Sequence, residues 1–408
     1  MPGFLGSEPA KVRAERNQLW QEFIRVVERV QPKVFVIENV DRFVRSPEFN
    51  DLQSRMQSGD LENYILVDPP GVDADDPAHV RARGYLLNSA DYGSPQARRR
   101  AIVIGVRTNT GLDAERFRYP RPTNGRAVVA ADSRAEWDLA GMPGLEPWVA
   151  ASTVFEDSAE RALTGVDLPR RERMIDEVAG PYLTTDLHIT RNPEPLSLAR
   201  YRAISPAGNR KDLRGTYLCT SDDGPTDHLI RKVGTFREGD GELAVEGDYL
   251  VLDGEHRGLS VSVTLADGGP RRRVATPGRR RSESYSVQVK RGAMAFNARL
   301  DYLSTASWDA HDAGSGDVMG RVRAGVPSVT IRTEFFKPEK GRYLHPTECR
   351  PITHYEAAKL QGFPDEFLWC GSKTEIARQI GNAVPIPLGR GIAQSIYEYL
   401  RSTVSATD

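Results

Sequence analysis

The sequence predicts an α/β protein, with helices and strands alternating over residues 1–107 and helices returning after residue 330. The first observation is the stretch ERNQLWQEFIRVVERVQ, in which apolar residues recur at helical spacing. The second is the apolar, β-branched run KVFVIE after Pro32, which is typical of a strand covered on both faces in a parallel sheet. The third is a pair of Ser/Thr-x-x-Glu capping boxes, beginning at Thr353 and Ser372, that open helices late in the chain.

Further strands are expected at 64–67, near 85–87 and at 101–106, because each is a short apolar run bounded by Gly, Pro or Asp. We expect these strands and the run KVFVIE to form one sheet. The amphipathic helix at the start of the chain then covers that sheet. A last helix is expected from about residue 388 to 401, where apolar residues form one stripe. We therefore expect the functional site to lie on this sheet.

The domain organisation follows from changes in pattern. Residues 1–107 are predicted to be the second half of a catalytic α/β domain, and residues 331–408 to return to it. Between them, residues 108–330 are weakly periodic and rich in Gly, Pro, Arg and Asp, which indicates a separate irregular domain. Alternating stretches within about 215–300 predict a β-rich insertion in that domain.

Length and composition limit the classes of protein. A chain of 408 residues favours two or more domains, and 39% hydrophobic and 27% charged residues are typical of globular proteins. No apolar run approaches the length of a membrane span, and the start lacks the apolar core of a signal peptide. We therefore expect a cytoplasmic protein without membrane partners. The three cysteines lack the paired spacing of a zinc site, so we expect neither a metal site nor a disulfide framework.

Local charge is more informative than the net charge of -1. The segment 271–291 holds eight basic residues and one acid, whereas 217–258 is rich in acids. A basic run can be a solvated loop, and it can also be a surface that attracts nucleic acid. The sequence pattern alone leaves both interpretations open.

The best candidate for chemistry is Glu38, which lies where the strand KVFVIE ends. In open α/β sheets, ligands bind beyond the carboxyl ends of the strands. An acid at this place can equally cap a neighbouring loop or helix. Downstream, strand alternation puts Arg98 and Arg100 on one face and Arg99 on the other, and two adjacent guanidiniums suit an anionic or carbonyl-rich ligand.

Four segments, in order, resemble the later motifs of the DNA cytosine-5 methyltransferases. They are PKVFVIENV, LNSADYGSPQARRRAIVIG, HPTECRPITHYEAAKLQGFPDEF and QIGNAVP. The resemblance covers about a third of the chain and is loose from 108 to 344. It implies a partial Rossmann-like methyltransferase sheet, with a separate target-recognition domain in the loosely matching region.

The resemblance also implies the reaction. Such an enzyme flips a cytosine out of double-stranded DNA and transfers a methyl group from S-adenosylmethionine to C5 of the base. Glu38 would then contact N3 of the cytosine, Arg100 its O2, and Arg98 would orient Glu38 or the attacking thiolate. Asn382 and Ala383 would bind the cofactor. The alternative role for Asn382 is structural: it would end a helix with a left-handed backbone conformation.

Two motifs of the family are missing from this sequence. It contains neither the Gly-containing cofactor turn nor the Pro-Cys dipeptide that carries the nucleophile, and Cys219, Cys349 and Cys370 lie outside such a context. The chain can be one part of a split enzyme, an incomplete version, or a degenerate relative. The first two explanations imply an N-terminal segment or a complementary subunit that carries the cysteine. A non-catalytic, sequence-specific DNA-binding or regulatory subunit is the rival function, and a generic nucleotide-binding protein is a weaker one.

The recognition domain is expected to supply cations for DNA. By resemblance, the chain would belong to a restriction-modification type of enzyme that must select its DNA sequence. Phosphate contacts set the register of such a protein on DNA, and exposed Arg and Lys make them. Our candidates are the following five residues: Arg210, Lys211, Arg279, Arg280 and Arg281.

Overall fold

In a computed structural model, the chain forms two compact units that are described separately. Unit 1 comprises Met1–Val149 and Val384–Asp408, and unit 2 comprises Ala150–Ala383. The described residues are 10–73, 75–110, 113–126, 144–156, 162–164, 167–168, 178–190, 192–224, 227–234, 245–266, 284–310 and 317–404.

The unit boundaries differ from the predicted domain boundaries of 107/108 and 330/331. Unit 1 extends beyond residue 107 because later segments bond back to it: Trp148 Nε1 donates to Asp91 Oδ1 at 2.9 Å. Residues 331–383 group with unit 2, since Trp369 Nε1 donates to Thr184 Oγ1 at 3.0 Å. The return to the first unit therefore begins at Val384 and not at residue 331.

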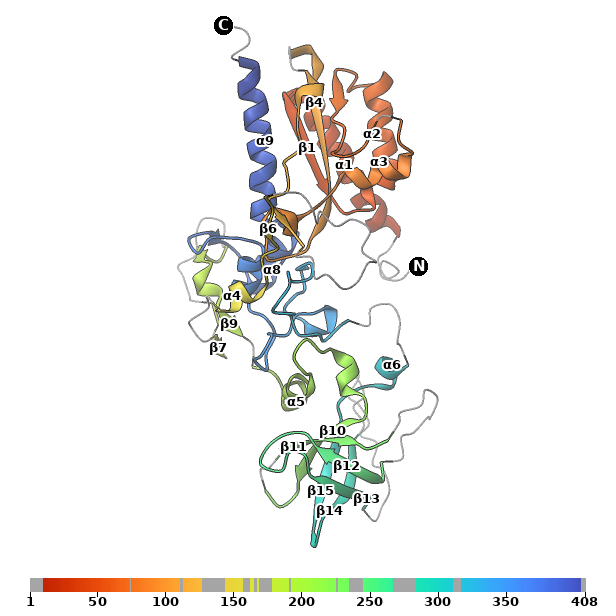
Figure 1. Ribbon diagram of the computed structural model, residues 1–408, viewed down its shortest axis with the longest axis vertical. Coiled ribbons are helices and arrows are strands. Elements are labelled where there is room, and N and C mark those ends of the chain that lie inside the picture. The colour runs from red at the N-terminus through yellow and green to blue at the C-terminus, as the bar shows by residue number, and fades with distance from the viewer. Residues whose placement is uncertain are drawn as a thin grey trace. The chain divides into compact units, whose positions relative to one another are not determined.

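The sheet of unit 1 has β4 at its centre (Figure 1). Strands β1 (Val34–Asn39), β2 (Tyr64–Leu66) and β3 (Leu86–Asn88) all pair with β4 (Arg99–Arg107) in antiparallel orientation. The strand positions agree with the prediction, but the expectation of parallel pairing was wrong. The sequence also predicts that β1 is covered on both faces, whereas Phe35 alone in β1 is buried and its other five residues are half-buried.

The antiparallel register of β1 and β4 explains one glycine. Phe35 lies opposite Gly105, and a Cβ atom at Gly105 would stand 2.2 Å from the Phe35 ring. A side chain therefore cannot replace the hydrogen of Gly105 unless the ring moves. The ring also packs edge-on against Phe23 and tilted against Tyr64, which joins the sheet to the first helix.

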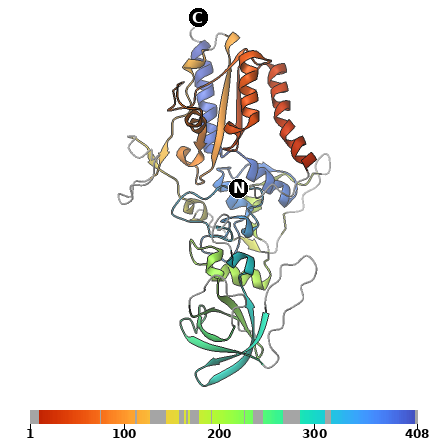
Figure 2. The same ribbon diagram turned by 90° about the vertical axis from the view of Figure 1, so that its right-hand side faces the viewer.

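Helices cover this sheet (Figures 1 and 2). Residues at helical spacing form α1, as predicted, and its Ile24 and Val27 enter the core. The last helix, α9, returns to the same core, since Tyr399 packs edge-on against Phe117 and donates to Asp113 O at 3.0 Å. The helices and short elements of unit 1 are α1 (Ala10–Val30), η1 (Phe43–Arg45), α2 (Pro47–Ser58), α3 (Ala78–Gly84), η2 (Ser89–Tyr92), η3 (Thr108–Thr110), η4 (Ala114–Arg116), β5 (Asn124–Gly125), β6 (Glu146–Pro147) and α9 (Ile386–Val404).

Unit 2 combines short helices and strands with a closed barrel. Both predicted capping boxes are present: Thr353 opens α7 and Ser372 opens α8, each with the reciprocal glutamate contact. Outside the barrel the elements are α4 (Ser152–Glu156), β7 (Leu163–Thr164), β8 (Tyr182–Leu183), η6 (Thr185–Leu187), β9 (Ile189–Thr190), α5 (Pro195–Ala203), η7 (Arg210–Leu213), α6 (Ala306–Asp309), η8 (Pro338–Lys340), α7 (His354–Leu360), β16 (Leu368–Trp369) and α8 (Lys373–Asn382).

Six antiparallel strands close the barrel, in the range where the sequence predicts a β-rich insertion. Alternate residues point inward and form a core of valines, leucines and tyrosines that includes Tyr217, Tyr249 and Leu300. Because the barrel is closed, each of its strands pairs with a strand on either side. The strands are β10 (Thr216–Ser221), β11 (Asp227–Lys232), β12 (Gly247–Val251), β13 (Ser260–Leu265), β14 (Ser284–Arg291) and β15 (Met294–Tyr302).

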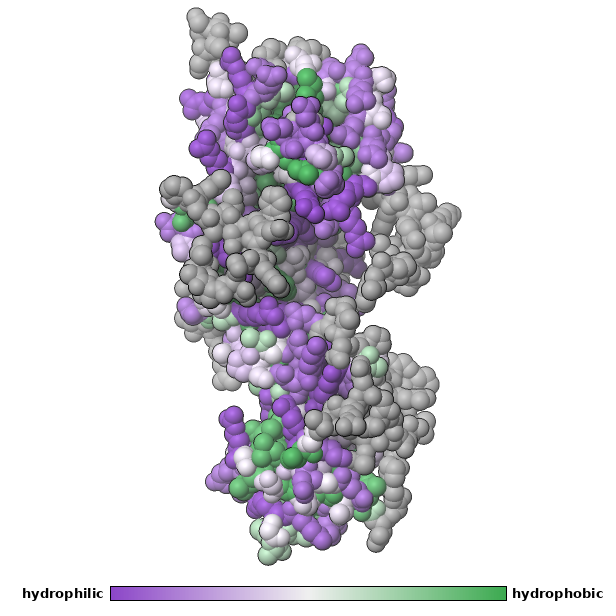
Figure 3. All heavy atoms as spheres, turned by 45° about the vertical axis from the view of Figure 1, so that its right-hand side comes forward, coloured by the Kyte–Doolittle hydropathy of each residue, from purple (hydrophilic) through white to green (hydrophobic). Residues whose placement is uncertain are grey.

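Hydrophilic side chains cover most of the face seen in Figure 3, with apolar residues in small patches. None of the helices in the described ranges is long and apolar enough to cross a bilayer.

Candidate active site

The register of β1 and β4 brings Glu38 to Arg100. Glu38 lies opposite Ile102, and Arg100 is two residues further along β4, so both side chains emerge from the same face as diagonal neighbours. Arg100 Nε lies 2.9 Å from Glu38 Oε1. The two residues that the sequence singled out by position and spacing are thus in contact.

The contact is an ion pair without hydrogen-bond geometry. Glu38 Oε1 is buried and has no hydrogen-bond partner within the described ranges, although Arg100 Nε is close to it. The Arg100 guanidinium uses another donor, Nη1, on the carbonyl of Arg99 at 2.7 Å. The side chains of Glu38 and Arg100 remain 26% and 15% exposed. The carboxylate therefore retains acceptor capacity that a ligand could use.

Glu38 of this pair also lines a pocket of about 290 Å³. Asn39 is the other polar residue of the lining, and the remaining lining residues are apolar. Electrostatic interactions are stronger in such surroundings than in water because the local dielectric constant is lower. The apolar residues of the lining are Trp20, Phe23, Val36, Ile37, Phe43 and Leu52.

The arginine run leads into β4 with the alternation that the sequence predicts. Arg98 is buried, Arg99 is exposed and Arg100 is intermediate. Ser89 fixes the backbone that carries Arg98: its N–H donates to Arg98 O at 3.1 Å, and its Oγ accepts from Arg98 N at 3.1 Å. The same hydroxyl donates to Gln96 O at 2.6 Å. Ser89 thus ties together both ends of the loop between β3 and β4.

Sequence reasoning missed Ser89 and Asp91, which lie inside the LNSADYGSPQ segment but carry no pattern of their own. Asp91 accepts from Trp148 Nε1 at 2.9 Å. Burial raises the pKa of the Asp91 carboxyl, while the Trp148 hydrogen bond and the charge of Arg99 act in the opposite direction. Asp91 and Trp148 are 57 positions apart in the sequence, so spacing alone could not reveal their contact.

The cofactor candidates lie at the end of α8. Asn382 is the last residue of that helix and its side chain is exposed, and Ala383 follows it with extended backbone. Asn382 is absent from the described residues with positive φ, so the left-handed alternative for it does not hold. An exposed amide at this position can donate to a carboxylate or accept from an ammonium group.

The cation candidates for DNA differ in their surroundings. Arg210 is buried and Nη1 donates to the carbonyl of Trp308, so this guanidinium is held inside unit 2. The burial of Arg210 contradicts its predicted role as a DNA contact. Lys211, its neighbour on η7, is exposed. The three further candidates, Arg279, Arg280 and Arg281, lie outside the described residues.

The three cysteines all belong to unit 2, whereas Glu38 and Arg100 belong to unit 1. Cys219 is in the barrel core, where burial raises its thiol pKa to about 12, with further raising by Asp227 and Asp222. Such a thiol stays protonated near neutral pH. Cys349 lies near Arg321, with 4.0 Å between Nη2 and Sγ, and Cys370 is exposed.

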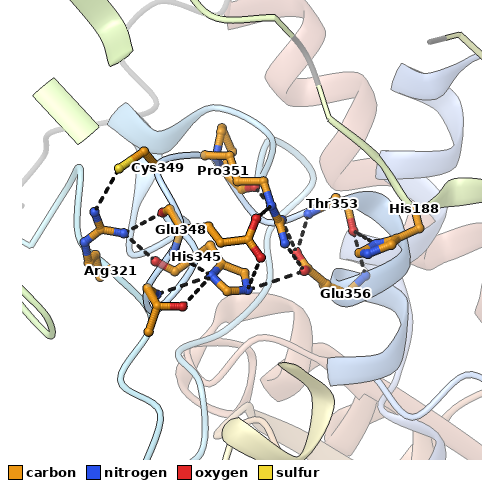
Figure 4. A network of polar contacts seen from close by, with 10 residues as sticks. His188, Arg321, His345, Glu348, Cys349, Pro351, Thr353 and Glu356 are labelled. Atoms are coloured by element: carbon orange, nitrogen blue, oxygen red, sulfur yellow. Dashed lines mark hydrogen bonds and ion pairs between the residues drawn. The ribbon is translucent and has the colours of Figure 1, made fainter. Parts of the chain in front are cut away.

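A second Glu–Arg pair, in unit 2, has a different environment (Figure 4). Arg350 donates two hydrogen bonds, of 2.9 and 2.7 Å, to the Glu356 carboxylate. Glu356 also accepts a hydrogen bond from Thr353 N at 2.8 Å. His345 lies 3.8 Å from the same carboxylate, and burial lowers its pKa to about 4. Arg321 donates to four backbone carbonyls nearby. Unit 2 itself thus supplies the hydrogen-bond partners of Glu356, Arg350 and Arg321.

Comparisons with known proteins identify the family of the chain. A sequence model of the C-5 cytosine-specific DNA methylases matches residues 8–142 and 275–398, which is more than half of the chain. The chain is 28% identical over 390 residues to the type II methyltransferase M.AgeI of Thalassovita gelatinovora, covering 93% of this chain and 77% of that protein.

Two further relatives are longer than this chain. The type II methyltransferase M.NgoFVII of Neisseria gonorrhoeae is 24% identical over 92% of the chain, and M.XorII of Xanthomonas oryzae is 29% identical over 95%. The chain spans 61% and 63% of the lengths of these two proteins, less than two thirds of each. The extent of the family match nevertheless decides the assignment. The chain belongs to the family of C-5 cytosine-specific DNA methylases.

Proposed function

We propose that this chain acts in methyl transfer from S-adenosylmethionine to C5 of a cytosine extruded from double-stranded DNA. The observation that carries the proposal is the contact between Glu38, at the end of β1, and Arg100 of β4, together with the largely apolar pocket that Glu38 lines. A carboxyl group next to a guanidinium can recognise the N3 and O2 edge of a pyrimidine, because one group faces a ring nitrogen and the other a carbonyl.

Glu38 would assist the reaction through N3 of the base. Cytosine C5 is a weak nucleophile until a thiolate adds to C6, and the resulting charge is stabilised when a carboxyl group donates a proton or hydrogen bond to N3. Arg100 holds the Glu38 carboxyl from one side and would donate to O2 of the same base. The two hydrogen bonds from Ser89 to the Arg98 backbone would hold the segment that leads to Arg100 in position.

Asn382 and Ala383 would bind the amino-acid end of S-adenosylmethionine. The exposed side-chain amide of Asn382 fits that role, since it can both donate and accept hydrogen bonds. The cofactor supplies the methyl group. The contribution of the chain would be to orient the cofactor's charged end.

The nucleophile would come from sequence other than residues 1–408. The reaction needs a thiolate, and Cys219 is kept protonated by the barrel core. Neither Cys349 nor Cys370 lies in a Pro-Cys sequence. A segment in the same polypeptide or a complementary subunit would carry the attacking cysteine.

The outer edge of β1 is a suitable place for that component to attach. Within the described sheet β1 pairs only with β4, and five of its six residues are half-exposed. On α1, Val26 and Val30 are exposed at 52% and 66%. A strand edge that lacks a partner within the described residues can accept a further strand.

The rival function is a DNA-binding or regulatory subunit without chemistry, which the lack of a suitable thiol favours. The test is to express the chain with its upstream coding sequence or its neighbouring reading frame and to measure transfer of labelled methyl groups to duplex DNA. The proposal predicts transfer that depends on S-adenosylmethionine. Specific DNA binding without any methyl transfer would support the rival instead.

A further inference from the structure

A pocket of about 230 Å³ lies within unit 2. Its lining comes from β9, from the first turns of α7 and α8, and from Phe336, Pro351 and Ile352. The volume equals that of roughly eight waters in the liquid, which is room for a small molecule. None of the lining residues takes part in the proposed methyl transfer, so the pocket needs a separate explanation.

Half of the lining residues are apolar. Ile189, Pro351 and Ile352 are buried, and Phe336 is half-buried. The Phe336 ring lies nearly parallel to the His354 ring, at an angle of 14° and with 5.9 Å between the centroids. Aromatic rings pack well against flat apolar groups. The pocket therefore suits a ligand with a planar apolar body.

His354 offers a hydrogen-bond acceptor to the pocket that it lines. The residue is 8% exposed, and its Nε2 lies 2.9 Å from Lys373 O. A carbonyl oxygen only accepts, so Nε2 carries the proton of this bond. Burial lowers the pKa of His354 to about 4, so the ring is neutral near neutral pH and Nδ1 keeps its lone pair. Nδ1 makes no hydrogen bond with the residues that the structure describes, and a donor from a ligand would satisfy it.

The first turn of α8 offers donors to an anion. Lys373 and Thr374, the first two residues of this helix, both line the pocket. Within the described ranges their backbone N–H groups have no hydrogen-bond partner, as is general for the first turn of a helix. The Lys373 ammonium pairs with Asp167, whose side chain is 88% exposed. Such an exposed ion pair contributes little, so a ligand anion can share this ammonium together with the positive end of the helix dipole.

We infer that this pocket binds a small planar carboxylate that also carries a hydroxyl group. The carboxylate accepts from the first turn of α8, the planar body packs against Phe336, and the hydroxyl group donates to His354 Nδ1. Each part of the ligand thus meets a protein group of the matching kind. The inference goes beyond the proposed function, because neither DNA nor methyl transfer enters it.

The probes are meta- and para-hydroxybenzoate, which combine the three parts in about ten non-hydrogen atoms. A ligand of this size with all its groups paired should bind with a Kd of about 0.1–1 mM. Binding is followed by NMR of the complete chain with isotope-labelled isoleucine methyl groups. The signals of Ile189 and Ile352, which line the pocket, should shift, whereas those of Ile24 and Ile104 in the core of unit 1 should stay unchanged.

Two analogues test the chemistry of the ligand. Para-hydroxybenzamide replaces the carboxylate with a neutral amide, and benzoate lacks the hydroxyl group. Each should bind about tenfold more weakly than the tighter of the two hydroxybenzoates, because one group of the pocket loses its partner. Equal affinity for either analogue would overturn the inference.

Lys373→Met tests the position of the carboxylate. The affinity should fall by about fivefold, a modest factor because the Lys373 side chain is 40% exposed. The matched control is Lys340→Met, since Lys340 is 39% exposed and is also ion-paired, with Glu334, but does not line the pocket. The control should keep the wild-type affinity. Equal affinities of the two variants would contradict the inference, and so would unshifted Ile189 and Ile352 signals at about 10 mM of both probes.

Discussion

Two Glu–Arg pairs, Arg350–Glu356 and Arg100–Glu38, differ in how completely the protein satisfies their hydrogen-bonding groups. In unit 2, Glu356 is fully buried and Arg350 is 8% exposed, and the carboxylate accepts two guanidinium bonds and one backbone bond. In unit 1, Glu38 and Arg100 are partly exposed, and their contact lacks hydrogen-bond geometry. Of the two carboxylates, Glu38 is the one left with capacity for a ligand.

This difference separates a structural role from a catalytic one on physical grounds. A buried charge must be paired and hydrogen-bonded by the protein itself, since water cannot reach it. A reactive carboxyl group must keep an acceptor or donor site open toward the substrate. The Arg350–Glu356 pair therefore stabilises unit 2, and the Glu38–Arg100 pair is the candidate for chemistry.

The largest effect on stability is expected from Arg350→Ala. The change leaves the Glu356 carboxylate buried without its guanidinium, which should cost about 3–5 kcal/mol. Hydrogen exchange of the backbone amides of α7 would measure the loss. Replacing both partners, as in Arg350→Met/Glu356→Leu, should cost less because no unpaired charge remains. If the single change cost no more than the double change, the structural role of the pair would be wrong.

A smaller loss is expected from Ser89→Ala, which acts on the loop that carries Arg98. The change removes the acceptor of Arg98 N and the donor of Gln96 O, both in buried surroundings. Two unsatisfied groups at about 1–1.5 kcal/mol each, the lower part of the usual range, give an expected loss of about 2–3 kcal/mol in urea unfolding of the chain. Ser89→Thr keeps the hydroxyl and should recover most of the loss. Equal destabilisation by Ala and Thr would contradict the role of the hydroxyl.

His354 makes the stability of unit 2 depend on pH. Burial lowers the pKa of His354 from 6.5 to about 4, and its ring bonds to Lys373 O at 2.9 Å. The unfolded state thus binds more protons between these values. The stabilisation is complete above about pH 6.5 and is lost as pH falls toward about 4.

Between about pH 7 and about pH 5, His354 should account for about 2 kcal/mol of lost stability. Urea unfolding of wild-type and His354→Gln protein at the two pH values would measure it. The variant should lose less stability on acidification than the wild type. Parallel losses in both proteins would show that other groups cause the dependence.

Two local rules were sufficient to single out Glu38 and Arg100 in the sequence. Glu38 was predicted from its position at the end of a strand, and Arg100 from a spacing of two along another strand. The antiparallel register then determines that the two meet, and register depends on contacts between residues far apart in the sequence. The orientation of the sheet was mispredicted for that reason: an apolar run reports burial on average and not the direction of its partner.

Contacts of individual polar side chains were not predictable. Arg210 looked like a surface cation, but the carbonyl of Trp308, 98 residues away, holds its guanidinium inside unit 2. The capping boxes at Thr353 and Ser372 were predictable because donor and acceptor are three residues apart. Hydrogen bonds between residues close in sequence can thus be predicted from the sequence, whereas those between distant residues become apparent only when the fold is known.

The most direct test of the account is methyl transfer by Glu38→Gln protein in the assembly that carries the nucleophile, with Glu62→Gln, an exposed glutamate of unit 1, as the matched control. Glutamine keeps the size of the side chain and removes its ability to donate a proton to N3. We predict that the rate of methyl transfer falls by about 10²–10⁴-fold in Glu38→Gln protein while the control and the unfolding midpoint stay unchanged. Transfer at the wild-type rate by Glu38→Gln protein would contradict the account.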